Sequence, residues 1–340
     1  MHITVQSRKE ETMKTVRRRM FIGLFFLCFI FSLGASCWTG ASAADYPDRP
    51  ITLVVPYPPG GSTDLAARVY ADFLEKLVKQ PVVVANKAGG ASTVGGNFVA
   101  QAKPDGYTLG YFPFHTAVPE VFNYFMDAPY SSKDFRPICT ITAAITVVAV
   151  KADAPWNSLK EVIEFAKKNP GMKFGHNGKN TPPFRLAAML DKQEKLDLVF
   201  VPFQGDSEVA LALLGDHIRL SAPIYASIKS LADGKKVKLL AASSKKRLDF
   251  APDIPTVNEL GYNSPSPDPQ SVYGPKGTPD AVVKLISDAS RKVVENPDFR
   301  NKVFGLGVPI IYQDTATIEK ANPQVKEEVY TFFKGEGLIK

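Results

Sequence analysis

The sequence predicts an α/β protein of two lobes with a ligand cleft between them. Short β-branched runs alternate with helical patterns along the body of the chain, which favours a mostly parallel sheet. A long apolar run at 141–150 is suited to crossing from one sheet into a second, and the alternation restarts after it. The length of 340 residues fits about two domains. Paired lobes of this kind place a ligand cleft between them.

The first elements of the body follow the order strand, loop, helix. The run at 51–55 is β-branched and typical of a buried strand. A loop rich in proline and glycine follows at 56–64, and residues 65–79 carry apolar side chains at helical spacing. A second strand is expected at 82–84, before a second glycine-rich loop at 86–96.

The later elements repeat this order. Helices are expected at 98–102, 159–168, 184–190, 207–214 and 278–296, and strands at 108–112, 172–175, 198–201, 237–242 and 271–274. Ser158 is expected to cap the second of these helices, and Thr278 the last, with Pro279 at its first position. We therefore assign residues 44–145 and 267–340 to the first lobe, and residues 146–266 to an inserted second lobe.

The N-terminal segment has the pattern of a secretory signal peptide. Three arginines at 17–19 precede an apolar run at 20–33, which is shorter than the roughly 20 residues of a membrane-spanning helix. An Ala-Ser-Ala cleavage pattern follows, so the signal peptide is expected over 1–43 and the mature chain from Ala44, in the periplasm. Cys37 offers a rival interpretation, a lipoprotein anchor, although the residues before it are a poor match for lipidation.

Charge and cysteine content exclude several functional classes. Of the formal net charge of +7, the leader supplies +4 through six basic and two acidic side chains, which leaves +3 for the rest of the chain. That charge is too small for a nucleic-acid groove. Cys139 is the one cysteine after the leader, so neither an intrachain disulfide nor a cysteine-based metal site is expected.

Two glycine-rich loops carry the chemistry. Gly60 and Gly61 let the backbone approach a ligand closely, and the free N–H groups at the start of the next helix bind anions without a basic side chain. The loop at 86–96 also joins a strand to a helix, so both loops are expected at the same sheet edge. Neither loop has the pattern of a P-loop or of a dinucleotide fingerprint, so nucleotide binding is not expected.

Several side chains near these loops allow two interpretations each. Asp64 suits a ligand amine or the first turn of a helix, where the dipole favours an acid. Tyr57 could cover the ligand or pack as a loop aromatic, and His115 could face the cleft or the solvent. Arg185 could clamp a carboxylate or remain a solvated helix charge, and the direction of Lys179 is open.

These loops and other motifs resemble the Bug family, the extracytoplasmic solute-binding proteins of tripartite tricarboxylate transporters. The matching segments are Tyr-Pro-Asp-Arg-Pro at 46–50, the loops at 55–64 and 86–96, Pro-Asp-Gly-Tyr-Thr-Leu at 104–109, and shorter motifs at 133–137, 169–171, 201–205, 253–256 and 275–279. The resemblance implies a type II-like periplasmic binding protein with two lobes. It would close on a small organic carboxylate and deliver it to membrane permease subunits, as a monomer without cofactor, metal or nucleic acid.

The resemblance also implies which residues bind the ligand. In the family, the loops matching 57–64 and 89–93 hold the ligand carboxylate through backbone amides and ordered water. The residues carried over are Tyr57, Pro58, Gly60, Gly61, Ser62, Thr63, Asp64, Gly90, Ala91, Ser92, Thr93, His115, Asn177, Thr181, Phe203, Gln204 and Gly205. This chain departs from the family at Asn180, which stands for a glycine, and at 203–204, where a Tyr-Lys/Arg pair becomes Phe-Gln.

Binding is favoured over catalysis. The sequence has neither a GxSxG nucleophile elbow nor an HExxH motif, and only His115, His176 and His217 follow the leader. A periplasmic enzyme acting on a small carboxylate remains the alternative. If neither Lys179 nor Arg185 points into the cleft, the ligand should carry one carboxylate and a less polar or aromatic tail, because a second buried carboxylate without a cation is costly.

We expect the exported protein to begin at Ala44, because the cleavage pattern ends at the residue before it. Intact-mass and N-terminal peptide mass spectrometry measure this directly. A diacylated cysteine at position 37 would contradict the prediction and make the protein a lipoprotein.

Overall fold

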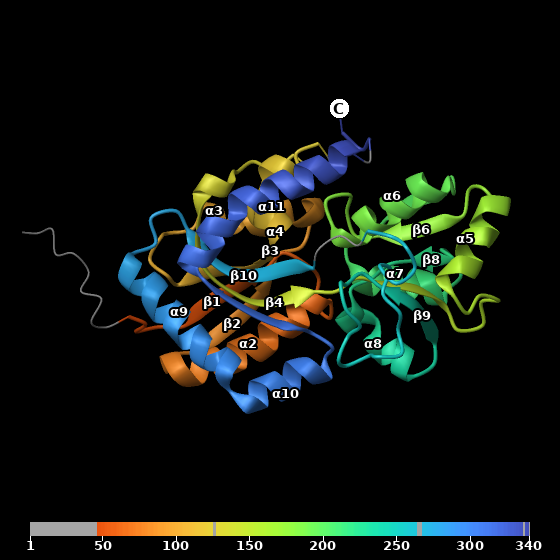
Figure 1. The fold of residues 1–340 in the computed structure, drawn as a ribbon. Helices are drawn as coiled ribbons and strands as arrows, with labels where there is room; N and C mark the ends of the chain where they lie inside the picture. The colour runs from red at the N-terminus through yellow and green to blue at the C-terminus, as the bar shows by residue number, and fades with distance from the viewer. Residues whose placement is uncertain (1–45, 125–126, 264–266, 336, 340) are drawn as a thin grey trace, which may run out of the picture. The chain divides into compact units, whose positions relative to one another are not determined.

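Two β-sheets, each flanked by helices, organise the protein (Figure 1). The structure is a computed structural model, and it describes residues 46–124, 127–263, 267–335 and 337–339. The predicted signal peptide, its cleavage site and Cys37 lie outside the described residues.

The first sheet has six strands in the order β11-β4-β10-β3-β1-β2. Their bounds are β1 Ile51–Val55, β2 Val82–Asn86, β3 Thr108–Pro113, β4 Phe135–Ala144, β10 Asp268–Pro275 and β11 Ile310–Asp314. β1 pairs in parallel with β2 and β3, whereas β10 runs antiparallel to β3 and β4. The expectation of a mostly parallel sheet is therefore wrong for this sheet, which is mixed. Asp268 at the start of β10 pairs with Ala144 at the end of β4, so the chain leaves and re-enters the sheet at one end.

The second sheet has five strands in the order β7-β6-β8-β5-β9. Their bounds are β5 Val147–Lys151, β6 Lys173–His176, β7 Val199–Pro202, β8 Leu220–Ser221 and β9 Val237–Ala242. β6 pairs in parallel with β7 and β8, whereas β5 runs antiparallel to β8 and β9. The parallel strands β6 and β7 each lead into a helix at their carboxyl ends, as β1 does in the first sheet.

Helices cover both faces of each sheet (Figure 1). Around the first sheet lie α2 Ser62–Val78, α3 Thr93–Ala100, α4 Phe114–Ala117, α9 Asp280–Glu295, α10 Pro297–Gly305 and α11 Thr315–Gly335. Around the second lie α5 Leu159–Lys168, α6 Pro182–Glu194, α7 Asp206–Leu214 and α8 Tyr225–Asp233. Among the described residues, no helix is both long and apolar enough to cross a bilayer.

The apolar run at 141–150 passes from one sheet into the other, as predicted. β4 ends at Ala144 and β5 begins at Val147, and every residue of the run is buried. Its first part contributes to the sheet that holds β10, and its second part packs on both helix layers of the second sheet through Val148 and Ala149. Burial on both sides explains why the run lacks the polar alternation of a surface strand.

Several sequence-based helix starts differ from the structure: the helix expected at 65–79 begins at Ser62, and the one expected at 184–190 begins at Pro182. The helix expected at 98–102 begins at Thr93, directly after the glycine-rich loop. The last helix is expected to begin at Pro279 with Thr278 as its cap, but it begins one residue later, at Asp280, with Pro279 at the cap position. The Thr278 hydroxyl donates to the Pro275 carbonyl, 2.7 Å away, instead of capping the helix. By contrast, Ser158 caps α5 as predicted, since its hydroxyl accepts from the Glu161 N–H at 3.2 Å.

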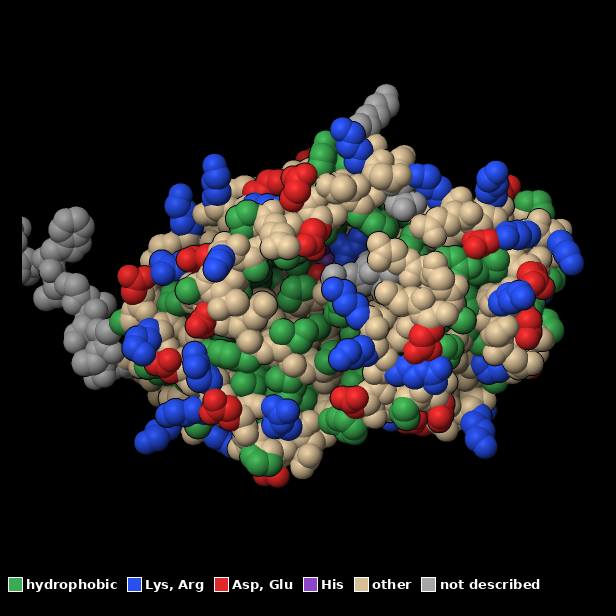
Figure 2. Space-filling view, viewed as in Figure 1, with side chains coloured by type: hydrophobic (Ala, Val, Ile, Leu, Met, Phe, Trp, Pro, Cys, Tyr) green, Lys and Arg blue, Asp and Glu red, His purple; other side chains and the backbone are tan. Residues whose placement is uncertain are grey.

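Charged side chains of both signs are interspersed over the visible face, without a continuous basic stripe (Figure 2). This distribution agrees with the small net charge of the chain after its leader. Cys139 is buried in β4 and unpaired.

Replacing Gly95 by alanine should destabilise the protein. A Cβ at this position in α3 would lie 2.8 Å from the Pro56 Cα and 2.9 Å from the Lys87 carbonyl oxygen, and neither backbone atom can move cheaply. We expect a loss of about 1–3 kcal/mol in the free energy of unfolding, measured by urea denaturation. Gly305→Ala is the control, because nothing lies within 4 Å of its added Cβ. Equal stability of the two variants would contradict this account of Gly95.

Candidate functional site

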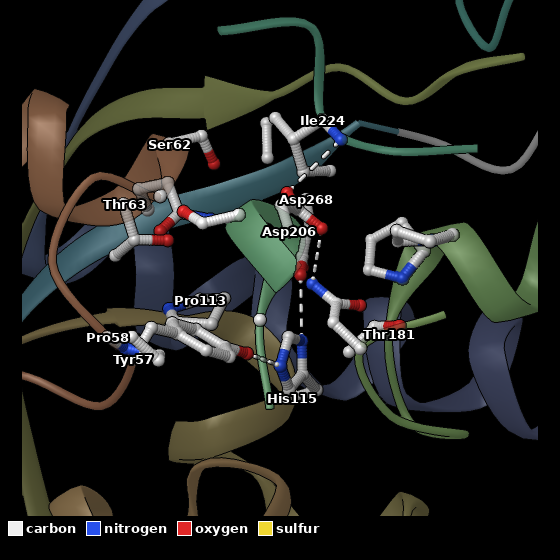
Figure 3. A pocket seen from close by; sticks show the side chains of 18 of the residues that line it. Tyr57, Pro58, Ser62, Thr63, Pro113, His115, Thr181, Asp206, Ile224 and Asp268 are labelled. Atoms are coloured by element: carbon white, nitrogen blue, oxygen red, sulfur yellow. Dashed lines mark hydrogen bonds and ion pairs between the residues drawn. The ribbon is translucent and has the colours of Figure 1, made fainter. Parts of the chain in front are cut away.

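A pocket lies where loops of the first sheet meet loops of the second. Its wall comes from the β1–α2 loop, the β3–α4 junction and β10, together with the starts of α6 and α7. The space between its atoms, including the open mouth, is about 530 Å³. Figure 3 shows side chains from these segments facing one another across it.

Nine of the predicted site residues line this pocket. They are Tyr57, Pro58, Gly61, Ser62, Thr63, His115, Asn177, Thr181 and Gly205. The other eight are outside the lining: Gly60, Asp64, Gly90, Ala91, Ser92, Thr93, Phe203 and Gln204. Whether any of the seventeen contacts a ligand stays a prediction.

Sequence reasoning missed ten residues of the wall. They are Pro113, Ala144, Pro182, Pro183, Asp206, Ser207, Glu208, Ile224, Asp268 and Gln270. Asp206, Ser207 and Glu208 directly follow the predicted Gly205 and start a helix after a strand, so the same loop-to-helix rule could have found them. Asp268 and Gln270 belong to β10, whose place beside β3 and β4 depends on long-range pairing.

Three helices begin at the pocket. The N-cap residues of α2, α6 and α7 are Gly61, Thr181 and Gly205, and all three line it. The first turn of a helix has N–H groups without partners inside the helix and a partial positive charge, so these ends favour an anion. α6 begins with two prolines, which lack an N–H, so the backbone donors come from α2 and α7. Among the described residues, neither lysine nor arginine lines the pocket.

Asp64 braces the β1–α2 loop. Its carboxylate accepts from the Gly60 N–H at 2.9 Å, from Arg68 Nε at 3.0 Å and from Asn86 Nδ2 at 2.8 Å. Burial alone raises the pKa of this carboxyl, but the hydrogen bonds from Arg68, Gly60 and Asn86 outweigh burial and hold the pKa below its usual value. Asp64 therefore lies in the first turn of α2, where its hydrogen bonds fix the loop that carries Gly61.

The second glycine-rich loop connects the two sheets. Ala91 and Ser92 have left-handed φ values of 51° and 84°, a conformation that costs a non-glycine residue roughly 1 kcal/mol. The Ala91 carbonyl accepts from Asn180 Nδ2 at 3.2 Å, and Ser92 Oγ accepts from Thr116 Oγ1 at 2.8 Å. The loop therefore joins the β6–α6 loop near the pocket rather than lining the pocket itself.

Tyr57, His115 and Asp268 form a hydrogen-bonded chain in the wall. His115 Nδ1 lies 2.9 Å from Asp268 Oδ2, and His115 Nε2 lies 2.6 Å from the Tyr57 hydroxyl (Figure 3). A carboxylate accepts only, so Nδ1 donates to it, and Nε2 is then the ring atom that can accept from the Tyr57 hydroxyl. Burial, helped by the Asp268 and Asp206 charges, raises the pKa of Tyr57 well above its usual value, so its hydroxyl keeps its proton.

Asp206 is a buried acid at the first position of α7. Its Oδ1 accepts from Asn177 Nδ2 at 2.8 Å, and its Oδ2 accepts from the Ile224 N–H at 3.2 Å and the Ser227 hydroxyl at 3.0 Å. Burial raises the pKa of this carboxyl to about 6, and the bonds from Ile224 and Ser227 only partly oppose the shift. The carboxylate thus ties α7 to the β6–α6 loop and to the start of α8.

Comparison with known proteins decides the family. The family model described as "Tripartite tricarboxylate transporter family receptor" matches residues 66–329. The chain belongs to this receptor family. A UPF0065 protein of Bordetella pertussis is 33% identical over 274 residues, which cover 79% of this chain and 84% of that protein.

Solved structures of other proteins share the receptor's fold. The periplasmic binding protein BugD is 27% identical, with a TM-score of 0.79 over 86% of this chain and 99% of that one. MatC from Rhodopseudomonas palustris, solved with bound malate, is 23% identical, with a TM-score of 0.78 over 84% of this chain and 99% of that one. The second likeness shows the fold alone. Together they confirm the predicted two-lobe binding-protein fold.

The two candidate cations of the receptor lie outside the pocket wall. Lys179 is exposed, and Arg185 is buried with its guanidinium 5.9 Å from the Phe122 ring centroid, beside a second cavity near α11. Burial lowers the pKa of Arg185, and the Asp268 charge opposes that shift.

Within the described residues, no group of three or more His, Cys, Asp or Glu side chains is placed to hold a metal ion.

Asp206 should give the receptor a measurable pH dependence of stability. Its pKa of about 6 exceeds the ordinary 3.8, so the folded state binds this proton more tightly and gains stability as the pH falls through 6. Between about pH 7.5 and about pH 5, the wild type should gain about 1 kcal/mol in the free energy of unfolding relative to Asp206→Asn.

Urea unfolding of ligand-free protein at both pH values measures this difference. Asp288→Asn, at an exposed position of α9, is the control and should show no such gain. A pH-independent difference between wild type and Asp206→Asn would contradict the raised pKa.

Proposed function

We propose that this receptor binds a small organic carboxylate in the pocket and delivers it to the permease subunits of a tripartite tricarboxylate transporter. The observation that carries the proposal is the meeting of three helix N-termini at a pocket whose described wall holds neither lysine nor arginine. Backbone donors and helix dipoles bind an anion in such a place without a basic side chain. Membership of the receptor family supports the same function.

The carboxylate is proposed to lie against the start of α2. Gly61, Ser62 and Thr63 line the pocket there, and their N–H groups have no partner within the helix. Asp64 holds the preceding turn through the Gly60 N–H, so these donors are fixed before the ligand arrives. The loop at 89–93 contributes by positioning the neighbouring β6–α6 loop.

The remaining parts of the proposal come from the sequence. They are export by a signal peptide at 1–43, a periplasmic location, a monomer, and lobes at 44–145 with 267–340 and at 146–266. The chain is proposed to bind without catalysis and without a cofactor. MatC, which has the same fold, binds malate, and this agrees with a small carboxylate as ligand.

The chain of Tyr57, His115 and Asp268 supports a second candidate function. A hydroxyl, an imidazole and a carboxylate in this order also serve as a proton relay in enzymes. A periplasmic enzyme acting on a small carboxylate would convert its ligand, whereas a receptor returns it unchanged. Mass spectrometry of the compound after prolonged incubation distinguishes the two functions.

Thermal-shift screening of refolded protein against small carboxylates should find at least one that raises the melting temperature. Calorimetry on that compound then tests the α2 site. Gly61→Val should weaken binding by about tenfold or more, because the valine side chain would occupy the path of the carboxylate. Gly61→Ala should cause a smaller loss.

The fold should tolerate both variants. The Gly61 φ is −75°, and an added Cβ meets its nearest atom, the Pro58 carbonyl oxygen, at 3.8 Å. Wild-type affinity in Gly61→Val would show that the start of α2 does not hold the ligand.

A further inference from the structure

We propose that the pocket also holds a cationic nitrogen of the ligand beside Asp206, so that the ligand is a small amino-carboxylate. Its carboxylate would lie at the start of α2, and its ammonium group at a set of hydrogen-bond acceptors on the opposite wall. The inference rests on the proposed function and names the ligand class for the same site.

The fixed charges of the wall are all negative. Asp206, Glu208 and Asp268 line the pocket, whereas the described wall contains neither lysine nor arginine. Asp268 is hydrogen-bonded to His115 and feels the charge of Arg185, and Glu208 is exposed to solvent. Asp206 is 95% buried, and the groups that bond it are neutral amides and a hydroxyl. A purely anionic ligand would face this carboxylate with only the start of α7 and neutral donors to offset the repulsion.

Two buried amide oxygens in the same wall lack partners. Asn177 and Gln270 are 92% and 96% buried, both line the pocket, and among the described residues neither Asn177 Oδ1 nor Gln270 Oε1 has a hydrogen-bond donor. An unsatisfied buried acceptor destabilises the folded protein, so donors from the ligand would relieve both. Gln270 and Asp268 are two residues apart on β10 and therefore project to the same face of the sheet.

Asp206 determines which atom Asn177 presents. Asn177 Nδ2 donates to Asp206 Oδ1, so the amide orientation is set by the carboxylate, and Asn177 Oδ1 is the atom left without a donor. An ammonium group has three donors and no acceptor, which matches this set of acceptors. A second carboxylate accepts only, so it would satisfy neither amide oxygen.

The two ends of the pocket are separate. In Figure 3, Ser62 and Thr63 lie on the left of the pocket, while Asp206, Asp268 and Thr181 lie to their right. One wall therefore offers the backbone donors of the α2 start, and the other combines the start of α7 with the side-chain acceptors of Asp206, Asn177 and Gln270. This polarity suits a zwitterion better than a dicarboxylate. The sequence led us to expect a ligand with a less polar or aromatic tail, whereas this arrangement favours a ligand whose second group is positively charged.

The first experiment compares ligands on the refolded wild-type protein. The probes are the common L-amino acids and the ω-amino acids glycine to 5-aminovalerate, each with the carboxylic acid that lacks its amino group, and the dicarboxylates malonate to glutarate. A thermal-shift screen selects the tightest compound, and calorimetry compares it with its analogue. We expect an amino-carboxylate to bind best and its analogue about tenfold or more weakly.

Every outcome of this comparison is decisive. If the best ligand is a carboxylate without an amino group, or if removing the amino group leaves the affinity unchanged, the ammonium site is overturned while the proposed function stands. If no carboxylate of either kind binds, the proposed function fails together with the inference.

The second experiment uses Asp206→Asn, which removes the carboxylate and replaces one acceptor of this wall with a donor. The new amide oxygen can keep the bonds from Ile224 and Ser227, and its Nδ2 then faces Asn177. The Asn177 amide has to turn its oxygen toward this donor, so its Nδ2 becomes the atom without a partner. Affinity for the amino-carboxylate should fall about tenfold or more, and affinity for the matching dicarboxylate should rise.

Asp288→Asn on α9 makes the same chemical change at an exposed site and should leave both affinities unchanged. A uniform loss for both ligands in Asp206→Asn would indicate that Asp206 only supports the fold, and this would overturn the inference.

Discussion

A pocket with no cation in its described wall can hold an anion through oriented backbone dipoles and neutral hydrogen-bond donors, and the placement of the helices in this receptor suits that constraint. β1, β6 and β7 each lead into a helix at their carboxyl ends, and the starts of α2, α6 and α7 all line the pocket. One strand of the first sheet and two strands of the second therefore each direct a helix N-terminus toward the pocket. The prolines at the start of α6 lack N–H groups, so this helix end offers fewer backbone donors than the starts of α2 and α7, although all three lie at the pocket.

The polar groups behind the wall keep this site rigid. Asp64 fixes the turn before α2, Asp206 ties α7 to two neighbouring segments, and Asp268 orients His115 and through it Tyr57. Hydrogen-bond donors surround these buried carboxylates, which is the condition under which burial of a charge is tolerated. The side-chain oxygens of Asn177 and Gln270 differ, because they have no donor among the described residues, and both residues lie in the pocket wall. A ligand in the pocket can therefore complete them.

The second glycine-rich loop has a different role from the first. Ala91 and Ser92 have left-handed backbone conformations, which are strained for residues other than glycine. The hydrogen bond from Asn180 to the Ala91 carbonyl connects this loop to the β6–α6 loop, which carries Asn177 and Thr181. Gly95 then allows α3 to pack directly on Pro56 and Lys87, next to the first loop. The loop therefore supports the pocket from outside, by holding together the segments that form it.

The sequence by itself determined the alternation of strands and helices, the crossing at 141–150 and the glycine-rich loop that leads into α2, because these depend on local patterns of apolar, proline and glycine residues. Helix starts were less accurate, since a cap depends on where a hydroxyl such as that of Thr278 finds its partner. Tertiary structure alone decided that β10 runs antiparallel beside β3 and β4, which brings Asp268 and Gln270 to the pocket. It also placed Arg185 beside another cavity and left Asp206 among neutral donors. These features depend on contacts between residues far apart in the chain, and no local pattern encodes them.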